Sequence, residues 1–168
     1  KASAASSSAA PKATLAPTSA GPTVSLCMIV RDEAEFLRQA VDSVQSIITE
    51  LIVVDTGSVD DTVEVAKSLG AKVFHQPWED DFAKARNFSL EHATGDWVLI
   101  LDADEAIAEE ELEGLKSHLQ DKSICWEFLQ RHYSNDHRLS EFQPVTGQFP
   151  KWERNYAGYF ESNLVRLF

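Results

Sequence analysis

Basic residues, cysteines and long apolar runs are all scarce in this sequence. The two cysteines, Cys27 and Cys125, both lie inside apolar runs, which is typical of buried free thiols and excludes the disulfide framework of a small secreted domain. No apolar run approaches the roughly 18 to 20 residues of a membrane span, and no secretory signal is visible. We therefore expect a cytoplasmic protein with no membrane span.

The balance of charge excludes further classes of partner. The chain has 27 acidic and 15 basic residues, a net charge of −12, which argues against nucleic acid or an anionic membrane as its main partner. An anionic ligand would need a local cation. The glycine-rich motifs of dinucleotide-binding domains and of P-loop proteins do not occur, so neither chemistry is expected. The histidines lack metal-ligand spacing and are interpreted as scattered surface or core residues: His75, His92, His118, His132 and His137.

What the sequence does contain is enough apolar material for one folded domain. Its 168 residues are 43% hydrophobic and 10% aromatic, an ordinary globular composition. Residues 1–22 are mainly Ala, Ser, Thr, Pro and Gly, a composition that buries too little surface to fold, so we expect a flexible linker or leader there. We expect the domain to span residues 23–168 and to lack its C-terminal part, since it closes on the strand-like run "LVRLF".

Apolar periodicity alternates between strand and helix along the domain. The pattern predicts an α/β fold with a mostly parallel sheet and helices on both faces, because buried parallel strands need crossover helices. Gly70 is expected to end one helix in the left-handed conformation. The predicted strands are 23–30, 50–55, 71–76 and 96–102, and the predicted helices are 35–47, 60–70 and 79–95.

Acidic and polar residues follow three of these strands, at 31–33, 55–58 and 102–105. Ligands of open parallel sheets bind beyond the carboxyl ends of the strands, so these residues are candidates for a site. Helix capping is the competing interpretation, because such side chains accept hydrogen bonds from free N–H groups. Capping is favoured for Asp32 and Ser58, and also for Asp60 and Asp61, which come shortly after Ser58.

Capping explains Asp102 and Asp104 less well. These carboxylates flank the small Ala103 at the end of a buried strand. Hard oxygen ligands of this kind suit Mg²⁺ or Mn²⁺, which often binds one or two protein carboxylates together with substrate phosphates. The triplet alone is weak evidence, and its place after a strand strengthens it.

Three segments together resemble a known family. "VSLCMIVRDEAEFL", "ELIVVDTGSVDDTVEVAKSLGAKV" and "FAKARNFSLEHATGDWVLILDADE" are similar to family 2 glycosyltransferases of the GT-A fold. The segments "QPWEDDFAKARN" and "DWVLILDADE" resemble sequences of the subgroup that is often found beside tetratricopeptide repeats. The resemblance covers residues from about Thr23 to Ala106.

The resemblance implies a metal-dependent, inverting transferase that binds a nucleotide-diphosphate sugar, usually a UDP-sugar. It implies that Asp55 recognises the base and that Arg86 helps to hold the nucleotide. Asp102 would meet the ribose or a metal-bound water, and Asp104 would ligate Mn²⁺ or Mg²⁺. The full set of implied nucleotide-sugar residues is Val30, Arg31, Glu33, Asp55, Arg86, Asp102, Ala103 and Asp104.

The acceptor side of the family pattern is where this sequence departs from it. An inverting transferase needs a carboxylate as general base for the acceptor hydroxyl, and the family supplies it well beyond the metal motif. We expect that base to lie past Phe168, with Glu153 and Glu161 as weak candidates within the chain. Residues 134–158 could form an acceptor loop or could be mobile. The acceptor, which could be a glycan, a protein or a lipid, is not identified.

Two interpretations of the function remain open. The first is an active glycosyltransferase, and the second is a non-catalytic nucleotide-sugar-binding or scaffold domain of the same fold. A phosphoacceptor signalling domain fits poorly, because Asp55 follows the second strand and no paired acids with a late-strand lysine appear. Six aromatic residues could stack on sugars, but buried packing is favoured for most of them: Trp78, Trp126, Trp152, Tyr133, Tyr156 and Tyr159.

Overall fold

A computed structural model of the chain describes residues 21–121 and 125–168, so nearly all of the expected linker lies outside the described residues. Those residues build one mixed sheet with the strand order β3-β2-β1-β4-β7-β5, and the short β6 pairs with β7. The predicted α/β class is confirmed. The strands are β1 (Val24–Val30), β2 (Glu50–Asp55), β3 (Lys72–His75), β4 (Trp97–Ile100), β5 (Trp126–Ser134), β6 (Gln143–Pro144) and β7 (Gly158–Leu167).

The four strands predicted from the sequence form the parallel half of the sheet. β1 pairs in parallel with β2 and with β4, and β2 pairs in parallel with β3. Their carboxyl ends therefore lie at one edge of the sheet. The side chains of β2 are all buried, which explains why its sequence is an almost continuous apolar run.

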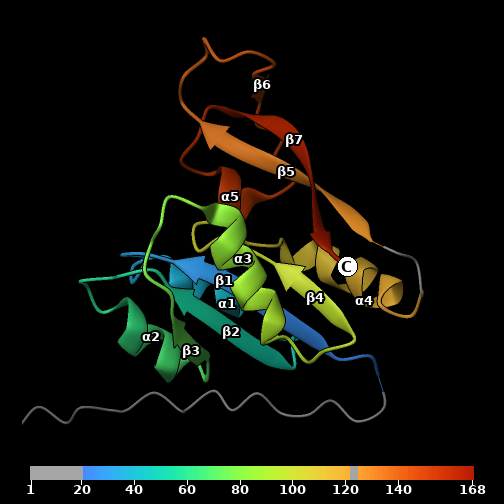
Figure 1. Cartoon of the computed structure of the whole chain (residues 1–168). Coiled ribbons are helices and arrows are strands. Elements are labelled where there is room, and N and C mark those ends of the chain that lie inside the picture. The colour runs from blue at the N-terminus through green and yellow to red at the C-terminus, as the bar shows by residue number, and fades with distance from the viewer. Residues whose placement is uncertain (1–20, 122–124) are drawn as a thin grey trace, which may run out of the picture.

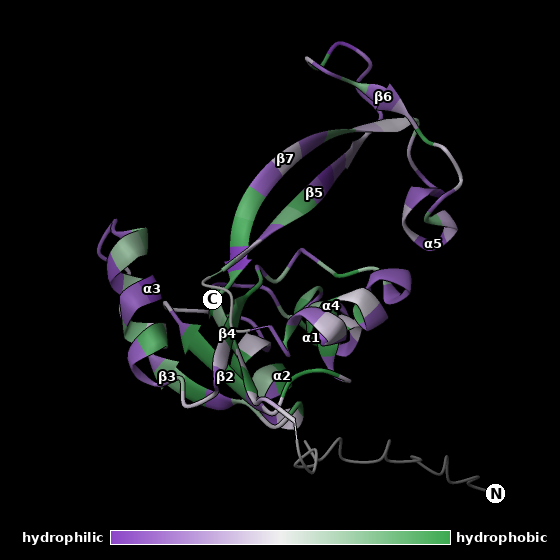
Figure 2. Cartoon of the chain, turned by 90° about the vertical axis from the view of Figure 1, so that its right-hand side faces the viewer, coloured by the Kyte–Doolittle hydropathy of each residue, from purple (hydrophilic) through white to green (hydrophobic). Residues whose placement is uncertain are grey.

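Helices cover both faces of this parallel half, with α3 on one side and α1 and α4 on the other (Figure 2). The large core cluster joins Leu26 and Met28 of β1 to the buried faces of α1, α2 and α4. The intervening residue, Cys27, faces α3, where its Sγ lies 3.7 Å from the carbonyl oxygen of Ser89. The helices are α1 (Leu37–Val44), α2 (Thr62–Ser68), α3 (Phe82–Glu91), α4 (Leu112–His118), which follows the 3-10 turn η1 (Glu109–Glu111), and α5 (Pro150–Glu153).

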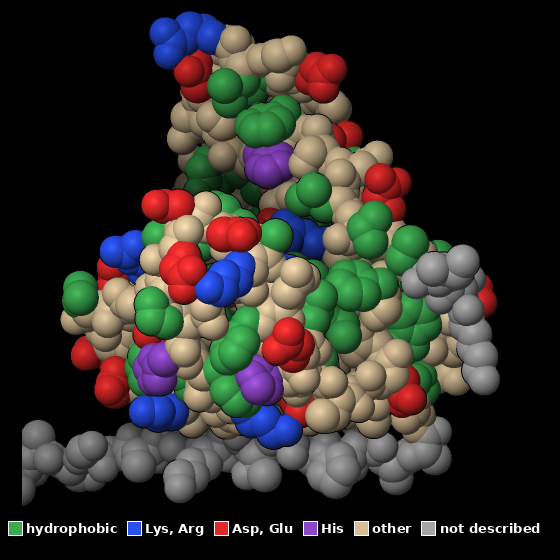
Figure 3. Space-filling model, in the orientation of Figure 1, with side chains coloured by type: hydrophobic (Ala, Val, Ile, Leu, Met, Phe, Trp, Pro, Cys, Tyr) green, Lys and Arg blue, Asp and Glu red, His purple; other side chains and the backbone are tan. Residues whose placement is uncertain are grey.

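The rest of the chain forms an arm that rises from the body of the molecule (Figure 1). β5 and β7 pair along their whole length as an antiparallel ribbon, and β6 and α5 lie in the long connection between them. The final residues of β7 return to the body, where Leu167 pairs with Leu99 of β4. On the face seen in Figure 3, acidic and basic side chains are interspersed over body and arm.

The predicted helix 79–95 is shorter in the structure and turns a different face inward. α3 ends at Glu91, and beyond it the N–H groups of His92 and Ala93 donate to carbonyl oxygens three residues back, while that of Thr94 donates to Glu50 Oε2 at 2.9 Å. The apolar spacing predicts an inward side made of Phe82, Ala85, Phe88 and Ala93. In the structure the buried residues are the small Ala85 and Ser89, whereas Phe82 is 73% exposed. Close contact between α3 and the sheet leaves room only for small side chains.

Two further expectations from the sequence have clear outcomes. Gly70 has a φ of 85°, so the predicted left-handed end of the second helix is confirmed. The prediction of two buried thiols is right for Cys27 and wrong for Cys125, which is exposed just before β5. Burial raises the pKa of the Cys27 thiol to about 11, which keeps it protonated and unreactive.

Candidate functional site

The carboxyl ends of β3, β2, β1 and β4 bring the predicted residues to one edge of the sheet. His75 ends β3 and Asp55 ends β2, and the two residues are partners in the strand register. Arg31 follows β1, and Asp102 follows β4. Since neighbouring strands lie about 4.8 Å apart, the ends of β2 and β4 are separated by roughly 10 Å.

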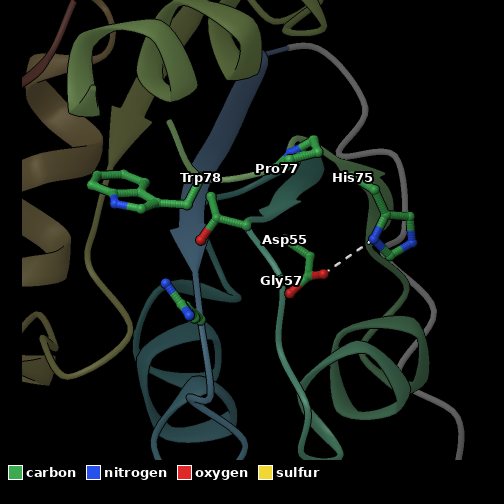
Figure 4. A pocket seen from close by; sticks show the side chains of 7 residues that line it. Asp55, Gly57, His75, Pro77 and Trp78 are labelled. Carbon is green, nitrogen blue, oxygen red and sulfur yellow. Dashed lines mark hydrogen bonds and ion pairs between the residues drawn. The ribbon is translucent and has the colours of Figure 1, made fainter. Parts of the chain in front are cut away.

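A cleft of about 360 Å³ opens at the β2–β3 side of this edge (Figure 4). Of the residues predicted to bind a nucleotide sugar, Asp55 and Arg31 line it. The complete lining is Arg31, Asp55, Thr56, Gly57, His75, Pro77 and Trp78. The cleft is therefore walled by a carboxylate, a guanidinium, an imidazole and an indole.

Asp55 is held in place by its neighbours. Its Oδ1 accepts the backbone N–H of Ser58 at 3.0 Å, and its Oδ2 lies 3.1 Å from Nδ1 of His75. Burial alone would raise the pKa of Asp55, but hydrogen bonds from Ser58 and His75 lower it below its usual value. The turn also needs Gly57, whose φ of 118° is strained for any other residue. The result is an ionised acceptor with a fixed orientation.

Trp78 forms the aromatic side of the cleft. Its Nε1 donates to Asp80 at 2.8 Å, and its ring centroid lies 4.6 Å from that of the exposed Phe82. Trp78 was expected to be buried by packing, and the structure leaves it half-buried at the cleft. An indole in this position can stack on a flat ligand.

The loops after β1 and β2 brace one another. Asp32 Oδ1 accepts the N–H of Val59 at 2.7 Å, and Ser58 Oγ accepts the N–H of Asp32 at 3.0 Å. Asp60 accepts the N–H of Thr62 at the start of α2, so it caps that helix as predicted. Asp61 makes no capping hydrogen bond with its side chain.

Val30 belongs to the core and not to the wall of the cleft. Its side chain is 2% exposed, and its carbonyl oxygen accepts both the N–H and the hydroxyl of Thr56. It can therefore shape the site only through the backbone. Its role in nucleotide-sugar binding stays a prediction, as do those of the other implied residues.

At the end of β4, Asp102 lies between two arginines. Arg86 Nη2, from α3, lies 3.3 Å from Asp102 Oδ1, and Arg166 Nη2, from β7, lies 3.5 Å from Asp102 Oδ2. Burial lowers the pKa of Arg86, and the charge of Asp102 opposes that shift. The negative charge of Asp102 is therefore offset by a guanidinium on each side.

Asp104 differs from Asp102 because its carboxylate is exposed and has no hydrogen-bond or ion-pair partner among the described residues. Ala103, between the two acids, is 4% exposed and belongs to the core. Burial raises the pKa of Glu33, and the nearby negative charge of Asp104 raises it further. This crowding of carboxylates favours a bound cation.

Within the described ranges, no three Asp, Glu, His or Cys side chains are grouped closely enough to hold a metal by themselves. The exposed carboxylate of Asp104 is a hard oxygen donor of the kind that suits Mg²⁺ or Mn²⁺, which commonly completes its coordination with phosphate oxygens and water. A strong zinc site of the kind built from four protein ligands would need more donors.

The weak candidates for a general base both lie in the arm. Glu153 of α5 is 4% exposed, and its Oε2 accepts the backbone N–H of Gly147 at 2.5 Å. Glu161 of β7 pairs with Arg131 of β5 at 3.1 Å. Both carboxylates have structural partners, and their catalytic role stays a prediction.

Sequence reasoning missed several residues of this edge. His75 was grouped with scattered histidines, although its place at the end of the third strand, next to the strand that ends in Asp55, could have identified it. Arg166 was also missed, and Glu105, although it lies in the candidate stretch 102–105, was given no role of its own. Their meeting depends on a long-range pairing of β7 with β4 that no local pattern predicts.

Comparisons with known proteins decide the family. The profile of the family "Glycosyl transferase family 2" matches residues 25–162. The chain belongs to this glycosyltransferase family. It is 41% identical over 152 residues to a TPR repeat-containing protein of Synechococcus elongatus, covering 86% of this chain and 37% of that protein. It is 34% identical over 141 residues to an uncharacterized glycosyltransferase of Rickettsia typhi, covering 81% of this chain and 48% of that protein.

A solved structure supports the fold. The mannosyltransferase PcManGT of Pyrobaculum calidifontis, in complex with GDP-Man and Mn²⁺, superposes with a TM-score of 0.52 at 25% identity. The match covers 64% of this chain and 35% of that one. The chain thus spans less than half the length of these relatives. The GT-A glycosyltransferase fold expected from the sequence is confirmed, and none of the helices in the described ranges is long and apolar enough to cross a bilayer.

Proposed function

We propose that this chain carries the donor-binding part of a metal-dependent, inverting glycosyltransferase whose donor is a nucleotide-diphosphate sugar, with UDP-sugar as the expected class. The observation that carries the proposal is the arrangement of one sheet edge. A cleft walled by Asp55 and Trp78 opens at one end of that edge, and the unpaired Asp104 beside the arginine-flanked Asp102 lies at the other.

Each part of the edge has a distinct task in this proposal. Asp55 accepts a hydrogen bond from the base, and Arg31 lies beside it in the cleft. Arg86 offsets negative charge of the diphosphate from the α3 side. Asp104, together with Glu33 nearby, holds Mn²⁺ or Mg²⁺, with Asp102 meeting the ribose or a metal-bound water. When bound, the cation supplies Lewis-acid stabilisation of the leaving nucleoside diphosphate.

A non-catalytic nucleotide-sugar-binding or scaffold domain is the second candidate. It is favoured by the state of the two acids in the arm, because Glu153 is buried against backbone N–H groups and Glu161 is paired with Arg131. Neither carboxylate is free to take a proton from an acceptor hydroxyl. Both candidates require the same donor site, so a binding experiment tests what they share.

The test is calorimetry of UDP binding with Mn²⁺ and with chelator. We expect binding to require the cation and to weaken at least tenfold in Asp104→Asn, which keeps the shape of the side chain and removes its charge. Glu109→Gln is the matched control, because Glu109 is an exposed acid a few residues away in η1. GDP is measured in parallel to test the choice of base.

Equal UDP affinity in chelator, or in Asp104→Asn, would contradict the metal assignment. Tighter binding of GDP than of UDP would not affect the metal assignment, but it would contradict UDP-sugar as the donor class.

A further inference from the structure

Arg166 is a nearly enclosed cation at the end of the arm that lies closest to the donor site. Its side chain is 12% exposed, and its Nη2 lies 2.5 Å from Glu105 Oε1 and 3.5 Å from Asp102 Oδ2. A cation removed from water in this way must be paired. Its partners are Asp102, the first acid of the predicted metal motif, and Glu105, which directly follows the motif.

Glu105 connects Arg166 to the backbone of the motif. Its Oε2 accepts the N–H of Asp102 at 2.9 Å, and the N–H of Glu105 donates to the carbonyl oxygen of Asp102 at 3.1 Å. Its Oε1 also accepts a hydrogen bond from Gln130 of β5. Glu105 therefore closes the turn 102–105, from which Asp104 projects into solvent.

The turn is held from two directions. Arg86 approaches from α3 and Arg166 from β7, so each carboxylate oxygen of Asp102 faces a different guanidinium. β7 reaches this place because Leu167 pairs with Leu99 of β4, and Phe168 exchanges backbone hydrogen bonds with Val98. The position of the turn thus depends on where β7 docks against the body.

We propose that Arg166 is a positioning residue of the donor site: through Glu105 and Asp102 it fixes the turn 102–105 and so the direction in which Asp104 meets a divalent cation bound with a nucleoside diphosphate. The inference rests on the proposed function. It adds a link between the arm, which carries β7, and the metal site. Arg166 does not touch the ligand in this arrangement, and it acts through the two carboxylates.

The test compares Arg166→Met with Arg166→Lys and with a control. Arg166→Met removes the charge at similar length, whereas Arg166→Lys keeps one nitrogen that can bridge Glu105 and Asp102. Arg131→Met is the control, because Arg131 is a similarly enclosed arginine of the same ribbon that pairs with Glu161 instead. Each variant is examined by UDP calorimetry with Mn²⁺ and by hydrogen exchange of the peptide 101–106 without ligand.

We expect Arg166→Met to weaken UDP binding with Mn²⁺ at least tenfold and to speed exchange in 101–106. Arg166→Lys should recover most of the affinity, and Arg131→Met should change neither readout more than about twofold. The double variant Arg166→Met with Glu105→Gln should bind UDP no more weakly than Arg166→Met alone, because residues that act through one another are not additive.

Several results would overturn the inference. Wild-type UDP affinity in Arg166→Met, or an equal loss of UDP affinity in Arg131→Met, would mean that Arg166 only stabilises the ribbon of β5 and β7. Additive losses in the double variant would mean that Arg166 acts on the ligand directly. If the wild-type chain binds no UDP, the proposed function fails, and hydrogen exchange still decides whether Arg166 orders the turn: unchanged exchange in Arg166→Met overturns that role.

Discussion

At the scale of single residues, Asp55 has clear structural partners and is also the residue proposed to recognise the base. Its two oxygens order the turn through Ser58 and the neighbouring strand through His75, and they still face the cleft. The sequence suggested a choice between capping and base recognition. The structure shows the turn-closing hydrogen bond, and base recognition stays a prediction for the same carboxylate, because the turn that it closes lines the cleft.

Asp55→Ala is expected to weaken UDP binding about tenfold, since an unmet hydrogen-bond partner typically costs ~1 to 3 kcal/mol. The fold should persist, with a melting temperature only slightly lower, because only the Ser58 N–H and the His75 ring lose a partner. Calorimetry and thermal unfolding measure the two effects separately. His75→Ala serves as the comparison, because it removes the neighbour and leaves the carboxylate, so its effect on binding should be smaller.

A large fall in the melting temperature of Asp55→Ala with unchanged UDP affinity would restore the purely structural interpretation of that carboxylate.

At the scale of secondary-structure elements, Glu50 ties the amino ends of the parallel strands together. It begins β2 and accepts hydrogen bonds from Ser25 of β1, Lys72 of β3 and Thr94 before β4. Gly95 completes this contact, because a Cβ there would lie 2.8 Å from the backbone nitrogen of Ser25. The contacts of Glu50 lie at the amino ends of the parallel strands, whereas the candidate site lies at their carboxyl ends. The residues that stabilise the sheet here are therefore separate from those proposed to bind the ligand.

Glu50→Gln should lower the free energy of unfolding by about 1 to 3 kcal/mol at pH 7, because buried donors lose a charged acceptor. Burial raises the pKa of Glu50, but the hydrogen bonds from Lys72, Ser25 and Thr94 outweigh it and lower that pKa from 4.5 to about 2. A carboxyl group whose pKa is lower in the folded than in the unfolded state stabilises the fold at pH values above its unfolded pKa. That stabilisation is lost as the pH falls toward the folded pKa. The difference between wild type and variant should therefore shrink between about pH 4.5 and pH 2.

Urea unfolding at several pH values measures this difference. Glu64→Gln, a change at an exposed acid of α2, provides the control and should show no such trend. A Glu50 effect that is constant from pH 7 to pH 2 would exclude an ionised Glu50 as the source of the stability.

At the scale of the whole molecule, donor recognition and the candidate bases belong to different parts. The body carries the strand-end site, whereas Glu153 and Glu161 lie in the arm that rises from it (Figure 1). The arm meets the site through Arg166, which pairs with acids of the body. The molecule therefore joins the candidate donor site to an arm in which Glu153 and Glu161 already have structural partners.

We expect the 168-residue chain to bind donor and to transfer sugar slowly or not at all. Without a positioned base the acceptor hydroxyl is a poor nucleophile, and losing such a group commonly costs ~10² to 10⁴ in rate. A donor-turnover assay measures hydrolysis and transfer for this chain and for a longer form of the protein. Glu161→Gln and Glu153→Gln are assayed beside them.

Equal rates of transfer by both forms, together with a loss in Glu161→Gln or Glu153→Gln, would place the base within residues 105–168.

The parallel half of the sheet, the family and the strand-end acids could all be predicted from the sequence alone. Continuous apolar strands such as β2 can be recognised locally because they are buried on both faces; Asp55 ends β2, and Asp102 and Asp104 come shortly after β4. Which residues meet at the edge depends on the tertiary structure. His75 joins Asp55 through strand register, and Arg166 reaches Asp102 from β7, 64 positions along the chain. Pairings of this kind depend on how distant elements dock, and periodicity carries no information about docking. For the same reason the exposure of Phe82 was not predicted: the close approach of α3 to the sheet, and not its apolar pattern, selects which side chains are buried.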